Sequence, residues 1–241
     1  METNRAQRAA HNNARWCDAV CRAHGGDTAF GAGAWFNRRA SPPYYPNLVT
    51  LDPHAGGVPA LAAIPGDGEL GVKDSFARLD LSSEGFSPLF DAQWIWRAPS
   101  PPADAARALR WSVALDAPAL DTWEAAWWRG VQSGPAPLRL FPPTLLAEPG
   151  LRFLMGREPD GRLSAGCALL QGDGVAGLAC VFRHGPGDPS AAHAELVDAA
   201  QALCPGHALV GYESGDDLRL AEEAGGFTPV GPLQVWLRRP A

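Results

Sequence analysis

Apolar residues recur with a helical period at the start of the chain and then give way to short apolar runs separated by Gly and Pro. The first pattern predicts an amphipathic helix that a glycine pair ends. The proline-rich segment at 98–102 continues neither a helix nor a strand, which makes it the best linker candidate. The elements expected before it are a helix over 7–24, a strand over 48–51, a helix over 73–84, and one or two strands over 86–96 interrupted near 88–91.

Beyond the linker, apolar runs and helical patterns alternate regularly. The nearly continuous apolar run 175–182 predicts a central strand that is covered on both faces. Asp188 or Ser190 is placed to cap the helix that follows it. The expected elements are a strand over 109–115, a helix over 119–129, a hairpin of strands over 151–157 and 163–171, a strand over 175–182, a helix ending at 203, a strand over 208–213, a helix over 216–224 and a strand over 233–238.

One part of this pattern occurs twice. The segment Gly85-Phe86-Ser87-Pro88 aligns with Gly226-Phe227-Thr228-Pro229, and the match extends over about twenty residues without gaps. The alignment predicts that the N-terminal third is a shortened copy of the C-terminal fold, and chance similarity of common residue types is the alternative. At the same offset, Arg78, Leu79, Gln93 and Arg97 meet Arg219, Leu220, Gln234 and Arg238.

Composition narrows the class of protein. Hydrophobic residues make up 46% of the 241 positions, which is enough for a substantial core. The net charge of −6 repels a polyphosphate backbone, so a nucleic-acid partner is not expected. No apolar stretch is long enough to cross a bilayer and the N-terminus lacks a signal-peptide pattern, so we expect no membrane association and a cytoplasmic location. Lys73 is the only lysine, which is typical of biased codon usage, and no function follows from it.

The sequence contains no metal-site pattern. The five cysteines have no ligand spacing, and their odd number fits buried thiols in a reducing compartment. His193 and Glu195 lie two positions apart on one predicted helix and therefore face different directions. We expect no metal, and no phosphate-binding loop or hydrolase elbow is present.

The closing block of the chain carries a family resemblance. A strand over 209–213, a short helix over 216–224 and the pair Gly226-Phe227 resemble the Gcn5-related N-acetyltransferase superfamily, as does the order of elements over about 109–238. The resemblance implies an α/β fold, with a mixed sheet flanked by helices. It also suggests the division of the chain: a truncated N-terminal α/β lobe over 1–98, a linker over 99–104 and an acetyltransferase-like domain over 105–241.

A second resemblance lies in the strand 177–182 and the glycine-containing loop after it. In the superfamily this strand and the next splay apart, the acyl thioester lies in the gap, and the following helix N-terminus binds the CoA pyrophosphate. The loop departs from the family pattern, because Pro186 and Pro189 fall where a basic residue and a glycine belong. The resemblance implies that acetyl-CoA, as substrate, is bound at Val181, Phe182, Arg183, Gly185, Gly187, Ala191 and Ala192.

Candidate catalytic residues are few. The family often uses a tyrosine in the last helix as general acid, but Glu222 stands at that position. A base is needed to accept the proton of the amine, and a buried carboxylate or a histidine can serve. Glu213 at a strand end is the first candidate and His184 the second, with a solvated loop side chain as the structural alternative for each. Tyr212 is expected to be packed.

These features support the hypothesis of an acyl-CoA-dependent N-acyltransferase, most simply an acetyltransferase, that acts on the amine of a small molecule. The alternative is a catalytically inactive relative that binds CoA, another small ligand or a protein partner. An open gap between the strands that end near Phe182 and Glu213 would favour the enzyme. We expect the many tryptophans to pack the two halves together, with the lining of an acceptor pocket as the alternative. The segment Pro42–Pro46 is a candidate for the rim of such a cleft, and a rigid turn is its alternative. The sequence leaves a homodimer open.

Overall fold

The computed structural model describes residues 2–54, 61–62, 64, 68–101, 107–131, 139–184 and 187–239. The helices are α1 (Glu2–Ala23), α2 (Ala117–Val131), α3 (Pro189–Leu203) and α4 (Gly215–Glu223), with short 3-10 turns at Ser82–Glu84 and Pro143–Ala147. The strands are β1 (Thr28–Phe30), β2 (Ala34–Asn37), β3 (Leu48–Thr50), β4 (Leu70–Asp74), β5 (Ser87–Arg97), β6 (Arg110–Val113), β7 (Leu151–Arg157), β8 (Leu163–Gly172), β9 (Val175–Arg183), β10 (Ala208–Glu213) and β11 (Thr228–Arg238).

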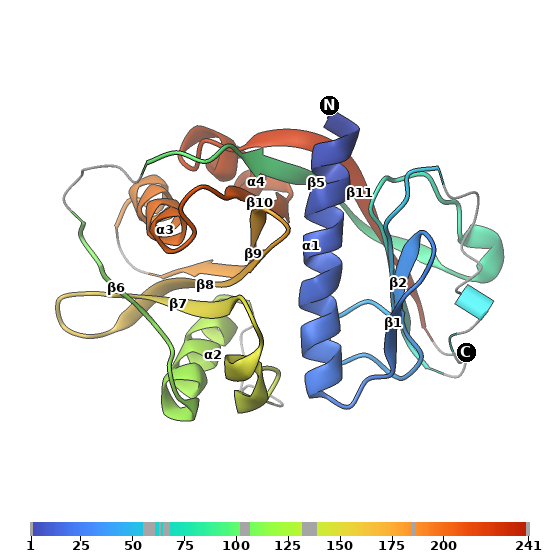
Figure 1. Cartoon of the computed structure of the whole chain (residues 1–241), viewed down its shortest axis with the longest axis horizontal. Coiled ribbons are helices and arrows are strands. Elements are labelled where there is room, and N and C mark those ends of the chain that lie inside the picture. The colour runs from blue at the N-terminus through green and yellow to red at the C-terminus, as the bar shows by residue number, and fades with distance from the viewer. Residues whose placement is uncertain are drawn as a thin grey trace.

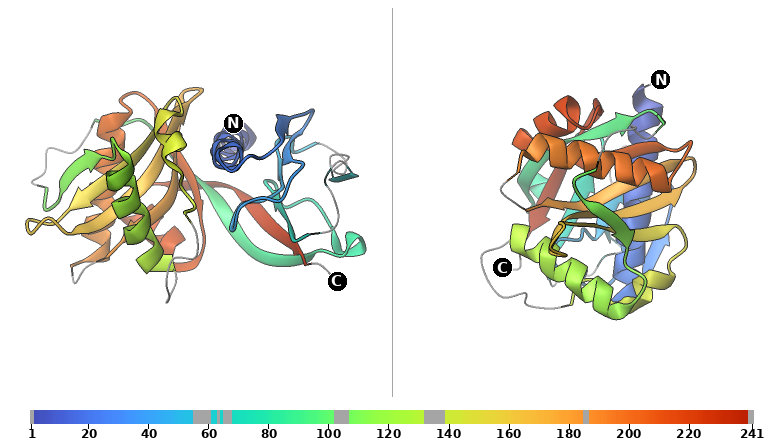
Figure 2. Two further views of the ribbon diagram at one scale, coloured as in Figure 1. Left: turned by 90° about the horizontal axis from the view of Figure 1, so that it is seen from below. Right: turned by 90° about the vertical axis from the view of Figure 1, so that its left-hand side faces the viewer.

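All of these strands join one mixed sheet in the order β1-β2-β3-β4-β11-β5-β10-β9-β8-β7-β6. The last strand of the chain, β11, pairs with β4 of the N-terminal half, while β5 of the N-terminal half pairs with β10. The two halves therefore exchange strands, and β5 and β11 run between them as a long twisted ribbon (Figure 2). We call the part with β1–β4 the N lobe and the part with β6–β10 the C lobe.

Helices cover the C lobe on both faces (Figure 1). Alternate residues of β7 show the two sides, since Phe153 packs toward α1 and α2 while Leu154 packs toward α3 and α4. Burial on both faces explains the nearly continuous apolar runs of the central strands. Helix α1 stands between the lobes and contributes to the cores of both, so the lobes share their hydrophobic interior.

The predicted repeat has a structural counterpart in the pairing of β5 with β11. Counted outward from the central β5–β11 pair, the strand directions on the two sides agree, except that the C lobe has one more strand, β6. Each half has a parallel pair, β3 with β4 and β9 with β10. The β5–β11 ladder has two irregularities, one that skips Leu89 and one that skips Val230. These two residues are equivalent at the offset that relates Gly85 to Gly226. The ladder thus has local twofold symmetry, which supports internal duplication.

The ends of this ladder follow the same symmetry. Gly85 and Gly226 both adopt positive φ, at 79° and 66°, where glycine is favoured. The side chain of Arg238 lies over Gly85, and that of its equivalent Arg97 lies over Gly226. Each Gly is followed by a buried phenylalanine. The aligned residues of the two copies therefore meet across the exchanged strands.

The predicted helix over 73–84 is wrong. Lys73 and Asp74 complete strand β4, and the chain then turns. The Asp74 carboxylate organises this turn, because it accepts hydrogen bonds from the backbone N–H of Arg78 at 2.6 Å and of Leu79 at 2.7 Å. A buried side-chain acceptor competes with helical hydrogen bonding, which sequence periodicity does not reveal. Strands β1, β2 and β4 were also missed, and the expected interruption at 88–91 is only a bulge within β5.

The order of elements after the linker is confirmed. Strand, helix, three strands, helix, strand, helix and strand follow one another from β6 to β11, as the resemblance implied. Asp188 caps α3, and its carboxylate accepts from the Ser190 N–H at 3.0 Å. Most of the expected linker 99–104 lies outside the described residues, and the division of the chain stays a prediction. Within the residues described, none of the helices combines the length and apolar character needed to cross a membrane.

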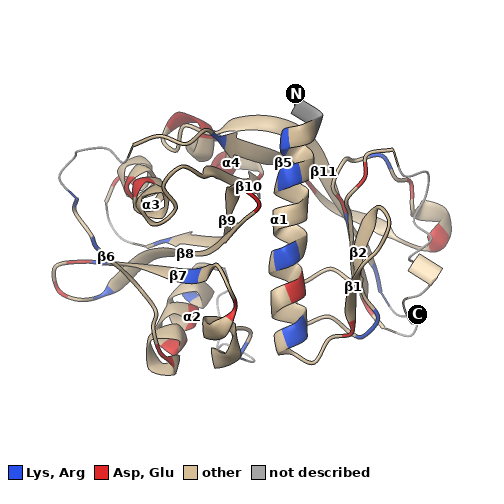
Figure 3. Cartoon of the chain, viewed as in Figure 1, with Lys and Arg blue, Asp and Glu red and all other residues tan. Residues whose placement is uncertain are grey.

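Polar contacts hold α1 against the C lobe, and the positions of its basic residues are coloured blue along the helix in Figure 3. Arg8 donates to the Asp173 carbonyl, and Arg15 forms an ion pair with the Asp173 carboxylate at 3.3 Å. Asn12 donates to the Leu170 carbonyl, and its side chain leaves no room for a Cβ on Gly177. Glycine at 177 therefore lets α1 approach β9 closely.

Candidate functional site

The parallel strands β9 and β10 separate part of the way along their length. They pair at three positions, of which the last joins Gly177 to Val210. Beyond this point β10 continues along β5 as far as Glu213, and β9 continues along β8. The second halves of β9 and β10 thus diverge, as the resemblance implied.

Strand β9 carries a bulge in its diverging half. Cys180 and Val181 together face the single residue Cys167 of β8, between the pairs Ala168–Ala179 and Gly166–Phe182. Cys180 adopts a φ of 53°, which is uncommon for a residue with a Cβ. Bulges often turn backbone groups toward active sites. This one lies where the sequence predicted thioester binding at Val181.

A cavity of about 270 Å³ opens at the divergence. Its walls come from both lobes and from the helices on one face of the sheet. The lining residues are Asn13, Trp16 and Cys17 of α1, Tyr44, Tyr45, Pro46 and Lys73 of the N lobe, Trp127 and Leu140, Leu178 to Val181 of β9, and Tyr212 and Glu213 of β10. Three residues of the segment 42–46 thus line this space, and its role at an acceptor cleft stays a prediction. We call this space the inter-lobe cavity.

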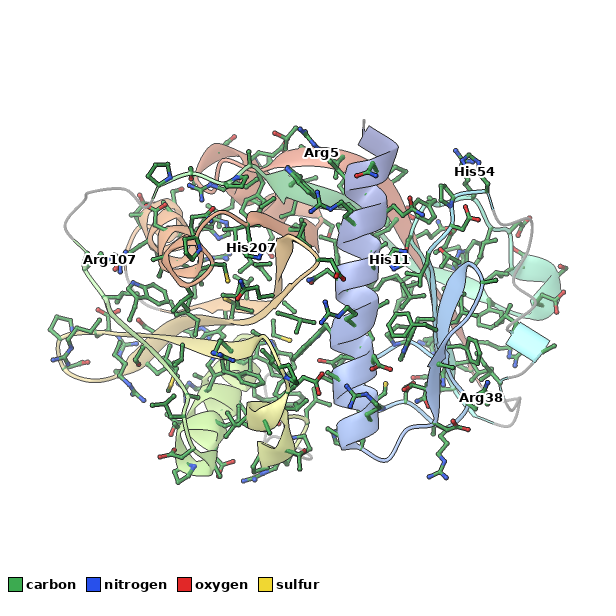
Figure 4. The ribbon with its side chains drawn as sticks, in the orientation of Figure 1. Arg5, His11, Arg38, His54, Arg107 and His207 are labelled. Carbon is green, nitrogen blue, oxygen red and sulfur yellow. The ribbon has the colours of Figure 1, made fainter. Side chains whose placement is uncertain are left out.

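Among the described residues that line the inter-lobe cavity, none is a histidine. His11 and His207, both labelled in Figure 4, lie elsewhere. His11 lines a separate cavity of about 190 Å³ beside α1, and His207 contacts Gln171. The same described lining residues include one carboxylate.

Glu213 is that carboxylate. It lies at the end of β10, and burial raises its pKa to about 7. The nearby charge of Asp217 contributes to this rise, while Arg183 opposes it. Arg183 itself bonds Asp217 at 2.7 Å. A carboxylate with a pKa near neutrality is suited to accept and release protons at physiological pH.

The cavity also contains a cation that the sequence analysis set aside. Lys73 is only 5% exposed, and its ammonium donates to Oδ1 of Asn13 at 2.8 Å. The same ammonium lies 4.1 Å from the centre of the Tyr212 ring. Tyr212 is thus packed, as predicted, against Lys73 on one side and Trp94 on another. The only signal in the sequence was that this lysine is unique.

Tyr45 brings a hydroxyl to the bulge. Tyr45 and Cys180 line the same cavity, and burial raises the pKa of Tyr45 well above its usual value. The ring packs against Trp16 with centroids 6.1 Å apart. The N lobe therefore places a protonated phenol next to β9.

A second cavity, of about 390 Å³, lies at the start of α3. It is lined by Arg183, His184, Gly187, Ala191 and Ala192. The structure thus brings together the described residues of the predicted pyrophosphate site, while Val181 lines the inter-lobe cavity. Gly185, the remaining candidate, lies outside the described residues.

The start of α3 is partly satisfied within the protein. Ser190 donates its N–H to the Asp188 carboxylate, and Ala192 donates to the Asp188 carbonyl at 3.1 Å. An anion at this end would meet the Asp188 charge as well as the helix dipole. Of the two alanines, we retain Ala191 as the donor in the proposal below.

Two candidates have clear structural contacts. Phe182 is buried and packs against Trp123 with ring centroids 5.5 Å apart. His184 stacks on Phe182 and bonds the Ala126 carbonyl of α2 through Nε2 at 2.7 Å. His184 faces the second cavity, so the two candidate bases lie in different cavities. Over the described ranges, no group of three or more His, Cys, Asp or Glu is arranged to hold a metal.

A mixed sheet with a diverging parallel pair and helices on both faces is the arrangement that the resemblance to the GCN5-related N-acetyltransferases implied. Comparison with solved structures agrees. A GCN5-related N-acetyltransferase from Kribbella flavida superposes with a TM-score of 0.60 at 16% identity, covering 95% of each chain. A putative acetyltransferase of the GNAT family from Novosphingobium aromaticivorans gives 0.59 at 16% identity, covering 94% of this chain and 96% of the other. No family model and no curated protein sequence matches the chain.

Proposed function

We propose that the protein transfers an acyl group, most simply acetyl, from a CoA thioester to the primary amine of a small molecule. The observation that carries this proposal is the inter-lobe cavity at the point where β9 and β10 diverge. Transfer requires room for a thioester and an amine side by side, and this cavity lies where the two strands separate. A volume of about 270 Å³ suits a small acceptor.

In the proposed reaction, the amine nitrogen attacks the thioester carbonyl carbon. The N–C bond forms, the C–S bond breaks, and the departing thiolate takes a proton. Backbone N–H groups at the bulge of Cys180 and Val181 stabilise the oxyanion, an effect worth about 3 kcal/mol for one such donor in other enzymes. Glu213 accepts the proton that the amine loses.

Tyr45 is the proposed donor to the thiolate. The helical tyrosine of the superfamily is replaced by Glu222, which is exposed on α4. The raised pKa keeps the Tyr45 hydroxyl protonated at neutral pH, and Tyr45 lines the same cavity as Cys180 of the bulge. The acid is thus proposed to come from the N lobe.

CoA itself is proposed to lie across the start of α3, with Arg183, Gly187 and Ala191 around the pyrophosphate. The cavity of about 390 Å³ supports this assignment. The alternative function, binding without transfer, draws on one observation: the Asp188 carboxylate already caps α3.

Thermal unfolding with millimolar acetyl-CoA or CoA tests the proposal, because a ligand of the folded state raises the midpoint. We expect a rise for the native protein and at least a tenfold loss of affinity in Ala191→Glu. Ala202→Glu places the same charge at an exposed position in the last turn of α3 and serves as the matched control. A screen of amines for thiol release then tests transfer. Binding without release would favour the inactive alternative, and no midpoint shift would refute CoA binding.

A further inference from the structure

Lys73 is a buried cation in contact with neutral groups. Its ammonium carries three N–H donors, one of which points to the Asn13 amide oxygen, and it faces the Tyr212 ring. Among the residues described, no aspartate or glutamate forms an ion pair with Lys73. A buried charge without a counter-ion is costly, and an anion bound in the cavity would remove that cost.

The field of this cation reaches the reaction centre. Burial raises the pKa of the Cys180 thiol to about 12, and Lys73 is one of the groups that oppose this rise. Glu213 lines the same cavity, but the cation that acts on its pKa is Arg183. The cavity therefore has a cation on the N-lobe wall and a proton acceptor on the C-lobe wall, which are not paired with each other.

We propose that the acceptor is an amine that also carries a carboxylate, in the class of amino acids, with its carboxylate bound by Lys73 and its amine directed to Glu213. This inference rests on the proposed acyl transfer and adds the substrate class. The product would be an N-acylated amino acid. Tyr44, Tyr45 and Trp127 line the rest of the cavity and favour an apolar or aromatic side chain.

The size and charge of the cavity favour a carboxylate over a phosphate. A phosphate monoester carries about −1.5 to −2 charges at neutral pH, and a single lysine would leave part of that charge unpaired. A carboxylate carries one charge and matches one ammonium. The volume of about 270 Å³ accommodates an amino acid but not a folded peptide segment.

The test compares matched acceptors that differ only in the carboxylate: phenylalanine with phenethylamine, tyrosine with tyramine, tryptophan with tryptamine and leucine with isoamylamine. Each is assayed with acetyl-CoA by thiol release and mass spectrometry. Because a hydrogen bond to a charged group contributes about 1.5 to 3 kcal/mol, we expect at least one amino acid to exceed its amine by about 10- to 150-fold in kcat/KM. A comparison of phosphoethanolamine with β-alanine as acceptors tests whether the site prefers a phosphate to a carboxylate.

Lys73→Met is expected to reduce this preference at least tenfold, mainly through KM, and Lys73→Arg to restore part of it. Arg39→Met removes an exposed cation of the N lobe outside the cavity and is the matched control. The comparison of acceptors with the native protein remains decisive if Lys73→Met does not fold. Equal rates for amines and amino acids, or a preference for phosphoethanolamine, would overturn the inference and leave acyl transfer intact.

Binding of N-acetyl-phenylalanine, measured by calorimetry without CoA, separates the two proposals. Binding by the native protein that is lost in Lys73→Met, together with no acetyl-CoA binding, would support the anion site and refute acyl transfer. If the protein binds acetyl-CoA but Lys73→Met leaves the binding of N-acetyl-phenylalanine unchanged, acyl transfer is supported and the anion site at Lys73 is refuted.

Discussion

The two parallel strand pairs of the sheet end differently. In the C lobe, β9 and β10 separate after Gly177 and Val210, and a cavity lies at the divergence. In the N lobe, β3 and β4 pair at two positions, and Thr50 then closes the space beyond them. The Thr50 hydroxyl contacts the Asp74 carboxylate and accepts a hydrogen bond from the Ser75 N–H at 2.7 Å.

The difference shows how one strand arrangement serves two purposes. Side chains at the strand ends, rather than the pairing, decide whether the gap is open. The N lobe has no counterpart of α3 or α4 among its described elements, but it supplies Lys73 and Tyr45 to the inter-lobe cavity. The C lobe holds most of the proposed reaction centre, and the N lobe forms a wall of it.

The largest expected effect tests whether the lobes are one folding unit. Trp123 is fully buried among Phe141, Phe153 and Phe182 of the C lobe. Trp123→Ala should lower the free energy of unfolding by about 3 to 5 kcal/mol, because it removes a large core side chain. Because the two halves exchange strands, this loss of stability should also reach the N lobe. The urea midpoint followed by hydrogen exchange in β3 and β4 should therefore fall as much as the midpoint of the C lobe. Two transitions, with the N-lobe transition unmoved, would show independent lobes.

The next effect concerns Glu213, which has no counterpart in the closed pair. Glu213→Gln should lower kcat/KM by about 10²- to 10³-fold, the usual contribution of a general base. In the native protein the rate should rise with pH to a plateau, with a midpoint near 7, as Glu213 loses its proton. Glu222→Gln, an exposed change on α4, is the control and should leave the profile unchanged.

The same variant has a predicted effect on stability. The folded pKa of Glu213 is about 7, above the unfolded value of about 4.3, so the folded state retains a proton that the unfolded chain has lost in this window. The stabilisation from neutral Glu213 is complete below pH of about 4 and is lost as the pH rises through 7. Glu213→Gln should therefore be more stable than native at pH 8 by about 1 to 2 kcal/mol. Calorimetry that showed the same difference at pH 4 would contradict this assignment.

An effect on stability of similar size is expected at the closed pair. Asp74 is 1% exposed and accepts several backbone hydrogen bonds as well as the contact from Thr50. Asp74→Asn should cost about 2 kcal/mol of unfolding free energy, because an amide group would face backbone donors. The affinity of Asp74→Asn for acetyl-CoA should equal that of the control variant Asp80→Asn, which changes an exposed residue of the turn. Loss of binding at native stability would show that the N-lobe pair belongs to the site.

The smallest effect compares two equivalent arginines. Arg97 bonds Asp198 and Gln201 of α3 in a half-buried position, so Arg97→Ala should cost about 1 kcal/mol. Arg238 stacks on Phe86 and contacts the Glu84 carbonyl, and Arg238→Ala should cost about 0.3 kcal/mol. Chemical denaturation of the single and double variants measures both. Equal losses of unfolding free energy would mean that α3, which has no counterpart among the described elements of the N lobe, adds nothing to the contribution of Arg97.

Sequence patterns predicted the C lobe better than the N lobe for a physical reason. The strands 151–157, 163–171 and 175–182 are apolar because helices cover both faces, and that pattern is strong. The missed strands β1, β2 and β4 are three to five residues long, too short to show a period. Around Asp74, the turn depends on one buried carboxylate, which the local sequence does not distinguish from a helical aspartate.

The candidate site shows the same limit. Glu213 and Val181 were predicted from their places at strand ends, and both line the inter-lobe cavity. Lys73 and Tyr45 were not assigned roles, because their approach to β9 and β10 depends on the twist of the exchanged strands. No pattern of nearby residues encodes that contact. Only the repeat around Gly85 and Gly226 indicated that the halves were related.

The place of β11 in the sheet has a consequence for synthesis on the ribosome. This strand comprises residues 228–238, yet it lies between β4 and β5 in the middle of the sheet. Until it has left the exit tunnel, the nascent N lobe has an open strand edge at β4, and β5 has one as well. Such edges can pair with other chains. The lobe made first therefore depends on the strand made last, and chaperone protection matters most during that interval.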